Sequence, residues 1–353
     1  MSDFRPVAAV CARSPLRIDF VGMTDFRPFC REFGGHVVNA PINKYIYATA
    51  EISDDRRFLF RAPDQNGLAL EVESLDALDP KGDLGLVQHI VKRMAPPFGM
   101  KLTTYSELPG GAGLGSSSTL ATCVIGLLND LMGCKLSDFE IADLAIDSEA
   151  EALDVEYGWQ DQYSPVTGAG VKYLRWWPGG SHRGIEVDPL NLRAEVMAEL
   201  EKCLVICFTG RSRPAGDILA KVAEGFRRRD PDVIEALQGM NDCADEIRLA
   251  LLRSQPFELG RLLNRVWELH KRLHPAVTND LVEGMYRVAR DHGALGGRVC
   301  GAGGGGTMMF YCESGAEYGV KRKLEEAGGR VFDFSFAAAG LQVWRVGEER
   351  VGR

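Results

Sequence analysis

The chain of 353 residues is long enough for two domains, or for one large domain with a shared core. Hydrophobic residues make up 45% of it and charged residues 25%, which are ordinary globular values and give no support for disorder. The formal net charge of −8 at pH 7 leaves no basic surplus to neutralise phosphates, so nucleic acid is not an expected partner.

Cysteine usage and hydropathy exclude further classes of protein. The nine cysteines contain no CxxC pair, so neither a disulfide framework nor a zinc site is expected. No apolar run approaches the roughly 20 residues that span a bilayer. We therefore expect no membrane partner and a cytoplasmic location.

The first half of the chain predicts a sheet followed by helices. Alternating apolar and β-branched or aromatic positions predict strands over 9–20 and 42–52, flanking a turn-rich segment from Val21 to Gly35. Another strand is expected over 100–107. Leucines and a valine recur at helical spacing from Leu120, and Gly133 stands where a C-cap glycine belongs. Ser137 and Glu140 form a capping box, which opens a helix through about residue 153.

The second half alternates helices with non-sequential strands. A soft domain boundary is expected in the proline-containing segment 186–192, before a strand that begins at Cys203. Helices are predicted near 215–228, 231–253, 257–272, 278–293 and 317–327, and strands in TMMFYCE, RVFDFSF and LQVWRV. This order predicts two α+β domains, over residues 1–190 and 191–353.

The sharpest motif is a glycine-serine loop between the strand at 100–107 and the helix that follows. Glycine accepts positive φ and lets a ligand approach the backbone, and the helix start offers unpaired N–H groups to an anion. A flexible linker is the alternative, although a linker rarely abuts a strand and a capped helix. The Walker A pattern is absent. The loop therefore predicts a phosphate cradle made of Pro109, Gly110, Gly111, Ala112, Gly113, Leu114, Gly115, Ser116, Ser117 and Ser118.

A second glycine cluster covers residues 301–306. It formally satisfies GxGxxG, which makes a dinucleotide-binding oxidoreductase the rival hypothesis. That fingerprint needs a helix after the glycines, whereas TMMFY is typical of a strand. Close backbone approach to a substrate or to the phosphate loop is the better interpretation, with tight packing alone as the alternative.

Acidic residues supply the candidate chemistry. Asp161 lies in a glycine-led turn, twelve residues after Glu149 on the preceding helix. One carboxylate could hold magnesium and the other face an acceptor hydroxyl. A turn or cap aspartate is the simpler alternative. Arg13 and Arg17, with Asp25 after a glycine turn, could hold an anionic substrate or form a surface ion pair; the spacing leaves both open.

Together these motifs resemble the GHMP kinase superfamily. Its three signatures occur in order, as SPLRIDFVGMTD, PGGAGLGSSST and GGRVCGAGGGG. The segments INKYIY, QDQY, WELHKRLHP and GALGGRVCGAGGGG are most similar to those of bacterial D-glycero-D-manno-heptose 7-phosphate kinases. The resemblance implies an N-terminal α/β domain and a C-terminal ferredoxin-like domain, with the active site in the cleft between them.

The resemblance also implies residue roles. ATP would bind residues 109–118 and magnesium would bind Ser117 and Glu149. Asp161 and Arg17 would be catalytic, Asp161 as the base and Arg17 on a phosphate or developing charge. The sugar or sugar-phosphate substrate would contact Arg17, Asp25, Gly35, Asp161, Gly303 and Gly304.

One departure concerns the acceptor. Heptose kinases of this kind typically read GGGTD in the first motif, whereas this chain reads Gly22-Met23-Thr24-Asp25. Three readings follow from this: a kinase that phosphorylates the anomeric hydroxyl of the heptose 7-phosphate, a fucokinase- or galactokinase-like enzyme for another sugar or polyol, and a non-catalytic sensor of ATP and sugar. The oligomeric state, including a homodimer, stays open.

Overall fold

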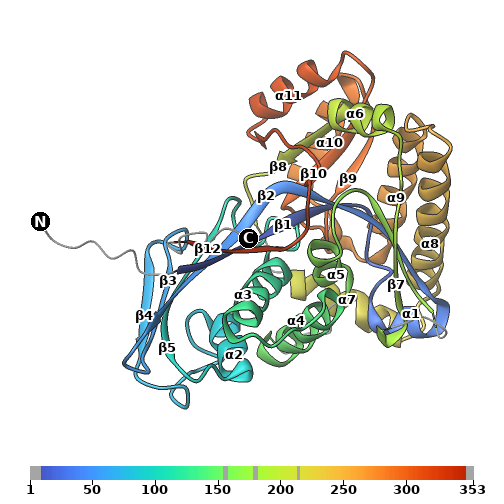
Figure 1. Ribbon diagram of the computed structural model, residues 1–353. Helices are drawn as coiled ribbons and strands as arrows, with labels where there is room; N and C mark the ends of the chain where they lie inside the picture. Colours follow the sequence, from blue (N-terminus) through green and yellow to red (C-terminus); the bar gives the residue numbers. More distant parts are fainter. Residues whose placement is uncertain (1–8, 154–157, 178–181, 213–214, 347–353) are drawn as a thin grey trace, which may run out of the picture.

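The protein is built around two β-sheets with helices on their faces (Figure 1). The computed structural model describes residues 9–153, 158–177, 182–212 and 215–346. The first sheet comes mostly from the N-terminal half, and the second is formed entirely by strands after residue 203. This matches the predicted order of α+β units.

The first sheet has eight strands, in the order β12-β1-β2-β5-β3-β4, with β6 pairing with β2 and β7 with β6. All of these pairs are antiparallel except β3 with β5. Glycine or proline marks several strand ends. In β1, alternate residues enter the core over 9–13, and residues 14–21 are all buried. The strands are β1 (Ala9–Val21), β2 (Gly35–Ser53), β3 (Phe58–Ala62), β4 (Leu68–Val72), β5 (Gly99–Ser106), β6 (Lys172–Trp176), β7 (Ile185–Pro189) and β12 (Gln342–Val346).

Helices from the middle of the chain cover one face of this sheet (Figure 1). The central helix, α3 (Ser116–Met132), packs on β1 and β2 and buries an apolar face that begins directly after the glycine-serine loop. The predicted C-cap is confirmed, because Gly133 ends α3 with φ of 66°. Around it lie α2 (Gly85–Met94), α4 (Asp138–Leu153) and α5 (Gln160–Val166).

The second sheet has four antiparallel strands in the order β11-β8-β10-β9. If these four strands are numbered along the chain, their order in the sheet is 4-1-3-2. This is the order of ferredoxin-like folds, as expected. Its strands are β8 (Leu204–Phe208), β9 (Ala294–Val299), β10 (Thr307–Cys312) and β11 (Arg330–Val331). The helices α6 (Ala194–Cys203), α10 (Asp280–Asp291) and α11 (Glu317–Glu326) pack against it.

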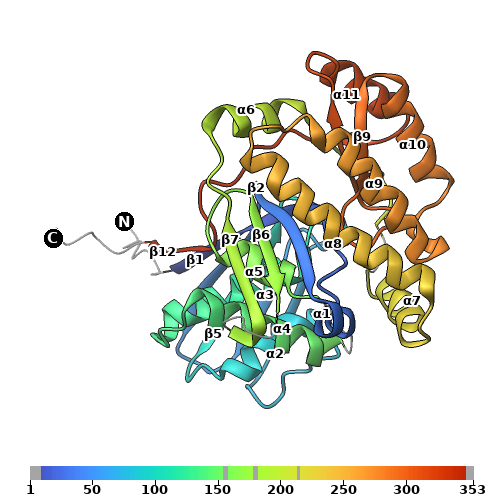
Figure 2. The same ribbon diagram turned by 90° about the vertical axis from the view of Figure 1, so that its right-hand side faces the viewer.

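A pair of long helices connects the two sheets. Figure 2 shows α8 (Pro231–Leu252) and α9 (Glu258–Leu273) lying side by side. The first helix packs on β1 and β2, and the second packs on β9 and β10 and also contacts β1. A further helix, α7 (Ala215–Arg227), precedes this pair. The edges of the two sheets are thereby held close together, and this is where the glycine motifs lie.

Three details differ from the sequence-based predictions. The turn-rich segment contains a short helix, α1 (Arg27–Phe33), which has Pro28 in its first turn and Gly34 as its C-cap. The segment expected as a boundary contains β7, which is stabilised as a strand by pairing with β6. The RVFDFSF segment forms only the two-residue strand β11 and an isolated bridge at Phe336. The boundary at residue 190 stays a prediction; the final strand, β12, returns to the first sheet.

In the part of the chain that the structure describes, no helix combines the length and the apolar character that crossing a membrane requires.

Candidate active site

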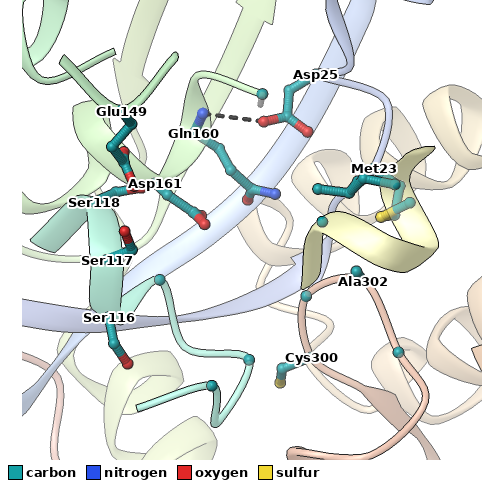
Figure 3. A pocket seen from close by; sticks show the side chains of 18 of the residues that line it. Met23, Asp25, Ser116, Ser117, Ser118, Glu149, Gln160, Asp161, Cys300 and Ala302 are labelled. Atoms are coloured by element: carbon teal, nitrogen blue, oxygen red, sulfur yellow. Dashed lines mark hydrogen bonds between the residues drawn. The ribbon is translucent and has the colours of Figure 1, made fainter. Parts of the chain in front are cut away.

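A cavity of about 630 Å³ lies where the three glycine-containing motifs meet. Figure 3 shows its walls: Ser116 to Ser118 at the start of α3 on one side, Cys300 and Ala302 in the loop before β10 on the other, and Asp25 with Gln160 above. The cavity therefore collects residues from both halves of the chain. Those lining it are Arg17, Met23, Asp25, Gly111, Gly113, Gly115, Ser116, Ser117, Ser118, Glu149, Leu153, Gly158, Gln160, Asp161, Gln162, Gly216, Asp217, Leu219, Ala220, Cys300, Gly301, Ala302, Gly303 and Gly305.

The glycine-serine loop has the backbone that its sequence predicts. Gly111, Gly113 and Gly115 have φ of 72°, 77° and 75°, in the left-handed region that favours glycine. A Cβ on Gly113 would stand 2.7 Å from the carbonyl oxygen of Cys300, so the loop also needs glycine to fit. The loop is tightly wound and presses against the third motif.

The helix start beyond this loop can receive an anion. The N-cap of α3 is Gly115, which has no side chain with which to cap the helix. The first N–H groups of a helix have no intrahelical partner, and the helix dipole favours negative charge beside them. Ser117 is exposed to the cavity, and the buried Ser116 Oγ has no hydrogen-bond partner among the described residues. This combination suits phosphate oxygens.

The third glycine motif approaches the phosphate loop as expected. The N–H of Thr307 donates to the carbonyl oxygen of Ala112 at 2.8 Å, and a Cβ on Gly301 would meet Gly113 at 3.0 Å. Five glycines of the motif have positive φ. The strand β10 follows them, which confirms that the motif lacks the helix of a dinucleotide fingerprint.

Glu149 is the best candidate for a magnesium carboxylate. Its side chain is fully buried, and burial raises its pKa above the ordinary value. The Gln162 amide Nε2 donates to Glu149 Oε2 at 2.5 Å and to Ser118 Oγ at 3.0 Å. Glu149 Oε1 has no hydrogen-bond partner within the described chain. A buried carboxylate with an unsatisfied oxygen beside serine hydroxyls fits a hard divalent cation.

The remaining magnesium ligands would have to come from elsewhere. Among the described residues, no cluster of three or more His, Cys, Asp or Glu side chains could hold a metal ion. Magnesium commonly uses one or two carboxylates together with phosphate oxygens of a nucleotide and waters. Glu149 and Ser117, which both line the cavity, are consistent with a magnesium ion that takes its other ligands from the nucleotide and from water.

Asp161 and Arg17 form a close pair at the centre of the site. Both Nε and Nη2 of Arg17 lie 2.7 Å from Asp161 Oδ1, and Nη1 of Arg17 donates to the carbonyl oxygen of Gly113. Burial by itself lowers the pKa of Arg17, but Asp161 and Asp19 outweigh it and raise that pKa above the ordinary value. The aspartate projects between Ser117 and Gln160 in Figure 3.

The position of Asp161 differs from the expected turn. It lies in the first turn of α5, and its side chain is 29% exposed, to the cavity. Because Oδ1 receives both Arg17 donors, Oδ2 is left facing Gly115, 3.4 Å from where a Cβ would stand. A carboxylate oxygen is therefore directed at the phosphate loop.

Asp25 holds the start of α5 in place. Its Oδ2 accepts hydrogen bonds from the backbone N–H groups of Trp159 and Gln160, at 2.9 and 3.1 Å. Gly158 makes this approach feasible, since a Cβ there would lie 1.8 Å from that oxygen. Burial, and then the nearby Asp161 charge, raise the pKa of Asp25 to about 6. Asp25 thus positions Asp161 and also borders the cavity.

The departure in the first motif has a structural consequence. Met23 has φ of 71°, a left-handed conformation in which a bulky residue is strained and a glycine is not. Its side chain is 4% exposed and lines the cavity. In Figure 3 it extends toward the helical turn of α7 that closes this side of the site. The loop therefore keeps the backbone shape that glycine would favour.

Several residues expected at the site lie just outside the cavity. Gly35 does not line it; a Cβ there would meet the Thr24 carbonyl oxygen at 2.5 Å, so this glycine serves close packing. Gly304 is hydrogen-bonded to Val277, whereas its neighbour Gly303 lines the cavity. Ala112 and Leu114 point into the core. Arg13 is bonded to Gln342, away from the site.

A second cavity of about 700 Å³ lies on the other side of the phosphate loop. It shares Gly111, Ser116, Ser117 and Leu153 with the first cavity, so one ligand can extend across the loop. The glycine-serine motif forms part of these walls, but no motif marked the remaining walls in the sequence, because they come from separate strands and helices. Its other lining residues include Pro109 and Gly110 and, from several elements, Ile46, Asp64, Gln65, Leu84, Leu86, Val87, Thr104, Tyr105, Ser106, Glu107, Leu108, Leu120 and Arg330.

Sequence reasoning also missed buried polar residues that support the site. Asp19 and Arg298 form an ion pair of 2.9 Å with both side chains completely buried. Asp19 follows Arg17 by two positions on β1, and side chains two positions apart in a strand lie on the same face. This spacing was a signal in the sequence that Asp19 lies beside Arg17. Gln162 lay inside the quoted QDQY segment without an assigned role.

Comparison with known proteins identifies the family. Residues 84–169 match the GHMP kinases N terminal domain, and residues 247–330 match the GHMP kinases C terminal domain. The chain is 33% identical over 340 residues to a D-glycero-alpha-D-manno-heptose 7-phosphate kinase of Campylobacter jejuni subsp. jejuni serotype O:2, covering 95% of this chain and 98% of that protein. The chain belongs to the GHMP kinase family.

Other relatives of this GHMP kinase act on sugars by name. It is 29% identical to a bifunctional fucokinase/GDP-fucose pyrophosphorylase of Arabidopsis thaliana, over 88% of this chain and 31% of that longer protein. The crystal structure of a D-glycero-D-manno-heptose 1-phosphate kinase from Bacteroides thetaiotaomicron superimposes with a TM-score of 0.77 at 27% identity, covering 96% of this chain and 99% of that one. The fold class expected from the sequence is confirmed. As a GHMP kinase, the protein is a phosphotransferase with an alcohol acceptor, and ATP is its phosphate donor.

Proposed function

We propose that this GHMP kinase transfers the γ-phosphoryl group of ATP to the anomeric hydroxyl of D-glycero-D-manno-heptose 7-phosphate. The observation that carries the proposal is the juxtaposition of Asp161, the phosphate loop and Glu149 around one cavity. A carboxylate directed at an anion cradle is what transfer to a hydroxyl requires. The similarity to the Campylobacter jejuni heptose 7-phosphate kinase supports the choice of acceptor.

In this mechanism the chain supplies position and charge. The amides of residues 109–118 and the start of α3 bind the phosphates, with the nucleoside in the second cavity. Asp161 accepts the proton of the acceptor hydroxyl, and Arg17 holds Asp161 and offers positive charge to the transferring group. Asp25 binds a substrate hydroxyl and fixes α5. Most of the acceleration in phosphoryl transfer comes from such positioning and charge stabilisation.

We propose magnesium as the metal, held by Glu149 and Ser117. When bound, magnesium would neutralise charge on the β- and γ-phosphates. The orphaned Glu149 oxygen supports this assignment. Because ATP is the co-substrate, we also propose that the enzyme works in the cytoplasm.

The acceptor is tested by assaying ATP consumption with a panel of alcohol acceptors. The panel contains heptose 7-phosphate, heptose 1-phosphate, the free heptose, L-fucose, galactose and mevalonate, and products are identified by ³¹P NMR. We expect the highest kcat/KM with the 7-phosphate and a new anomeric phosphate signal. A higher kcat/KM with a free sugar would replace the proposal by a fucokinase- or galactokinase-like function. Nucleotide and sugar binding without turnover on any acceptor would indicate a sensor.

A further inference from the structure

A chain of buried polar groups links the catalytic arginine to the third glycine motif. Asp19 on β1 pairs through Oδ2 with Arg298 on β9 at 2.9 Å, and neither side chain is exposed at all. Through Oδ1, Asp19 accepts a hydrogen bond from the N–H of Gly301 at 3.0 Å and lies 3.6 Å from Nη1 of Arg17. The Asp19 carboxylate therefore contacts Arg17 on β1, Arg298 on the second sheet and the N–H of Gly301 in the third glycine motif.

His270 on α9 continues this chain. Its Nε2 lies 3.2 Å from the carbonyl oxygen of Ala302, and its Nδ1 lies 3.5 Å from Nη2 of Arg298. A carbonyl oxygen only accepts and a guanidinium only donates, so the ring must carry its proton on Nε2 and accept at Nδ1. Burial, and then the Arg298 charge, lower the pKa of His270 well below its ordinary value, so the ring is neutral.

The contacts of these buried polar groups indicate that they fix the geometry of the active site. Gly301 and Ala302 line the cavity, and Gly301 touches Gly113 of the phosphate loop. Arg17 holds both Asp161 and the Gly113 carbonyl oxygen. The buried chain therefore reaches both faces of the point where phosphoryl transfer would occur. A buried ion pair is often no more stabilising than well-packed apolar residues of similar volume, so stability alone does not account for it.

We propose that Asp19, Arg298 and His270 are positioning residues for phosphoryl transfer. They hold Arg17 and the Gly301–Ala302 turn in register across the junction of the two sheets. Their effect is on the chemical step, because a displacement of about 1 Å at a reacting centre can lower the rate about 100-fold. The inference rests on the proposed kinase activity. An inactive wild-type protein would defeat that function, whereas fully active variants would defeat only the positioning role.

The first test compares two replacements of His270. His270→Leu removes both hydrogen bonds, whereas His270→Gln keeps one donor for Ala302 and one acceptor for Arg298. We expect the leucine variant to lose about 10- to 100-fold in kcat, with the KM for ATP changed less than about threefold. The glutamine variant should recover most of the kcat. Unchanged kcat in a folded leucine variant, or equal losses in both variants, would overturn the proposal.

A second variant covers the case in which the leucine protein does not fold. Arg298→Lys keeps the buried positive charge but cannot bridge Asp19 and His270 at once. We expect its kcat to fall about tenfold or more while it remains folded by circular dichroism. Tyr311→Phe is the matched control, since it removes one partly buried hydrogen bond, to Glu199, from the same sheet. Its melting temperature should fall without a change in kcat. A lysine variant that behaves like this control would refute the positioning role.

Discussion

At the residue scale, Asp161 carries the proposed proton transfer. Asp161→Asn keeps the shape of the side chain but removes its basicity and its charge attraction to Arg17. We expect kcat to fall by about 10²–10⁴-fold, with the KM for ATP little changed because the nucleotide contacts are elsewhere. Steady-state kinetics test this. Asp143→Asn is the control: Asp143 on α4 accepts a hydrogen bond from Tyr163, which lies on α5 with Asp161, and Asp143 does not line the cavity. An Asp161→Asn enzyme as active as this control would exclude Asp161 as the base.

Glu149 should govern the metal dependence. Glu149→Gln removes the buried negative charge and should raise the magnesium concentration needed for half-maximal binding of a non-hydrolysable ATP analogue by about 10- to 100-fold. Titration calorimetry measures this without turnover. Glu151→Gln, two positions along α4, removes a surface carboxylate that pairs with Arg93 and should have no effect. Equal magnesium requirements in the two variants would place the metal elsewhere.

Asp25 should leave a signature in the pH dependence of stability. Its pKa is raised to about 6 in the folded protein from an ordinary value of 3.8. At low pH the Asp25 carboxyl is protonated in both the folded and the unfolded protein. At high pH it is ionised, and burial of that charge destabilises the folded protein. Its stabilising contribution is thus fully present below about pH 3.8 and is lost as the pH rises through about 6.

A comparison with Asp25→Asn isolates this contribution, because asparagine does not titrate. We expect the free energy of unfolding of the wild type, minus that of the variant, to decrease between pH 4.5 and pH 7 in urea denaturation. A difference that is constant, or that increases with pH, would mean that burial does not dominate at Asp25.

At the element scale, the phosphate loop and the start of α3 act as one unit. Gly115→Val would put a Cβ 3.2 Å from Asp161 Cγ and force a branched residue into the left-handed region. Gly133→Val imposes the same strain at the other end of α3, where no atom of the described residues lies within 4 Å of the added Cβ. Both variants should lose about 1–2 kcal/mol of stability. Only the first should lose ATP binding, measured by calorimetry; normal ATP affinity in the first variant would contradict the cradle.

Elements with local signals could be predicted from the sequence. The capping box is formed, with the N–H and Oγ of Ser137 both donating to Glu140 Oε2, because its partners lie three residues apart. The phosphate loop is equally local, since its glycines carry the turn themselves. The short helix α1 had signals that were overlooked: Pro28 near its start and Gly34, with φ of 77°, at its end.

Features that depend on distant partners could not be predicted in this way. Asp161 was expected in a turn, yet it sits on a helix whose start is held by Asp25, more than 130 residues earlier. The strand β7 exists through pairing with β6. Asp19 and Arg298 are 279 positions apart, so nothing local marks their contact. The resemblance supplied the residue roles, whereas the supporting contacts appear only in three dimensions.

At the scale of the whole molecule, the site is assembled by the meeting of two sheets. Ligands that bind only this arrangement stabilise the folded state by about 2.7 kcal/mol at 100 times their Kd. An ATP analogue with magnesium should therefore raise the melting temperature in a concentration-dependent way, and EDTA should abolish the increase. NAD serves as the control and should have no effect. Stabilisation by NAD but not by the ATP analogue would revive the oxidoreductase hypothesis.

The most direct test is a crystal structure with a non-hydrolysable ATP analogue, magnesium and heptose 7-phosphate. We expect the γ-phosphate at the amides of Gly113 to Ser117 and the anomeric oxygen within about 2.6–3.2 Å of Asp161 Oδ2. A nucleotide bound away from this loop, or an acceptor hydroxyl out of reach of Asp161, would contradict the account.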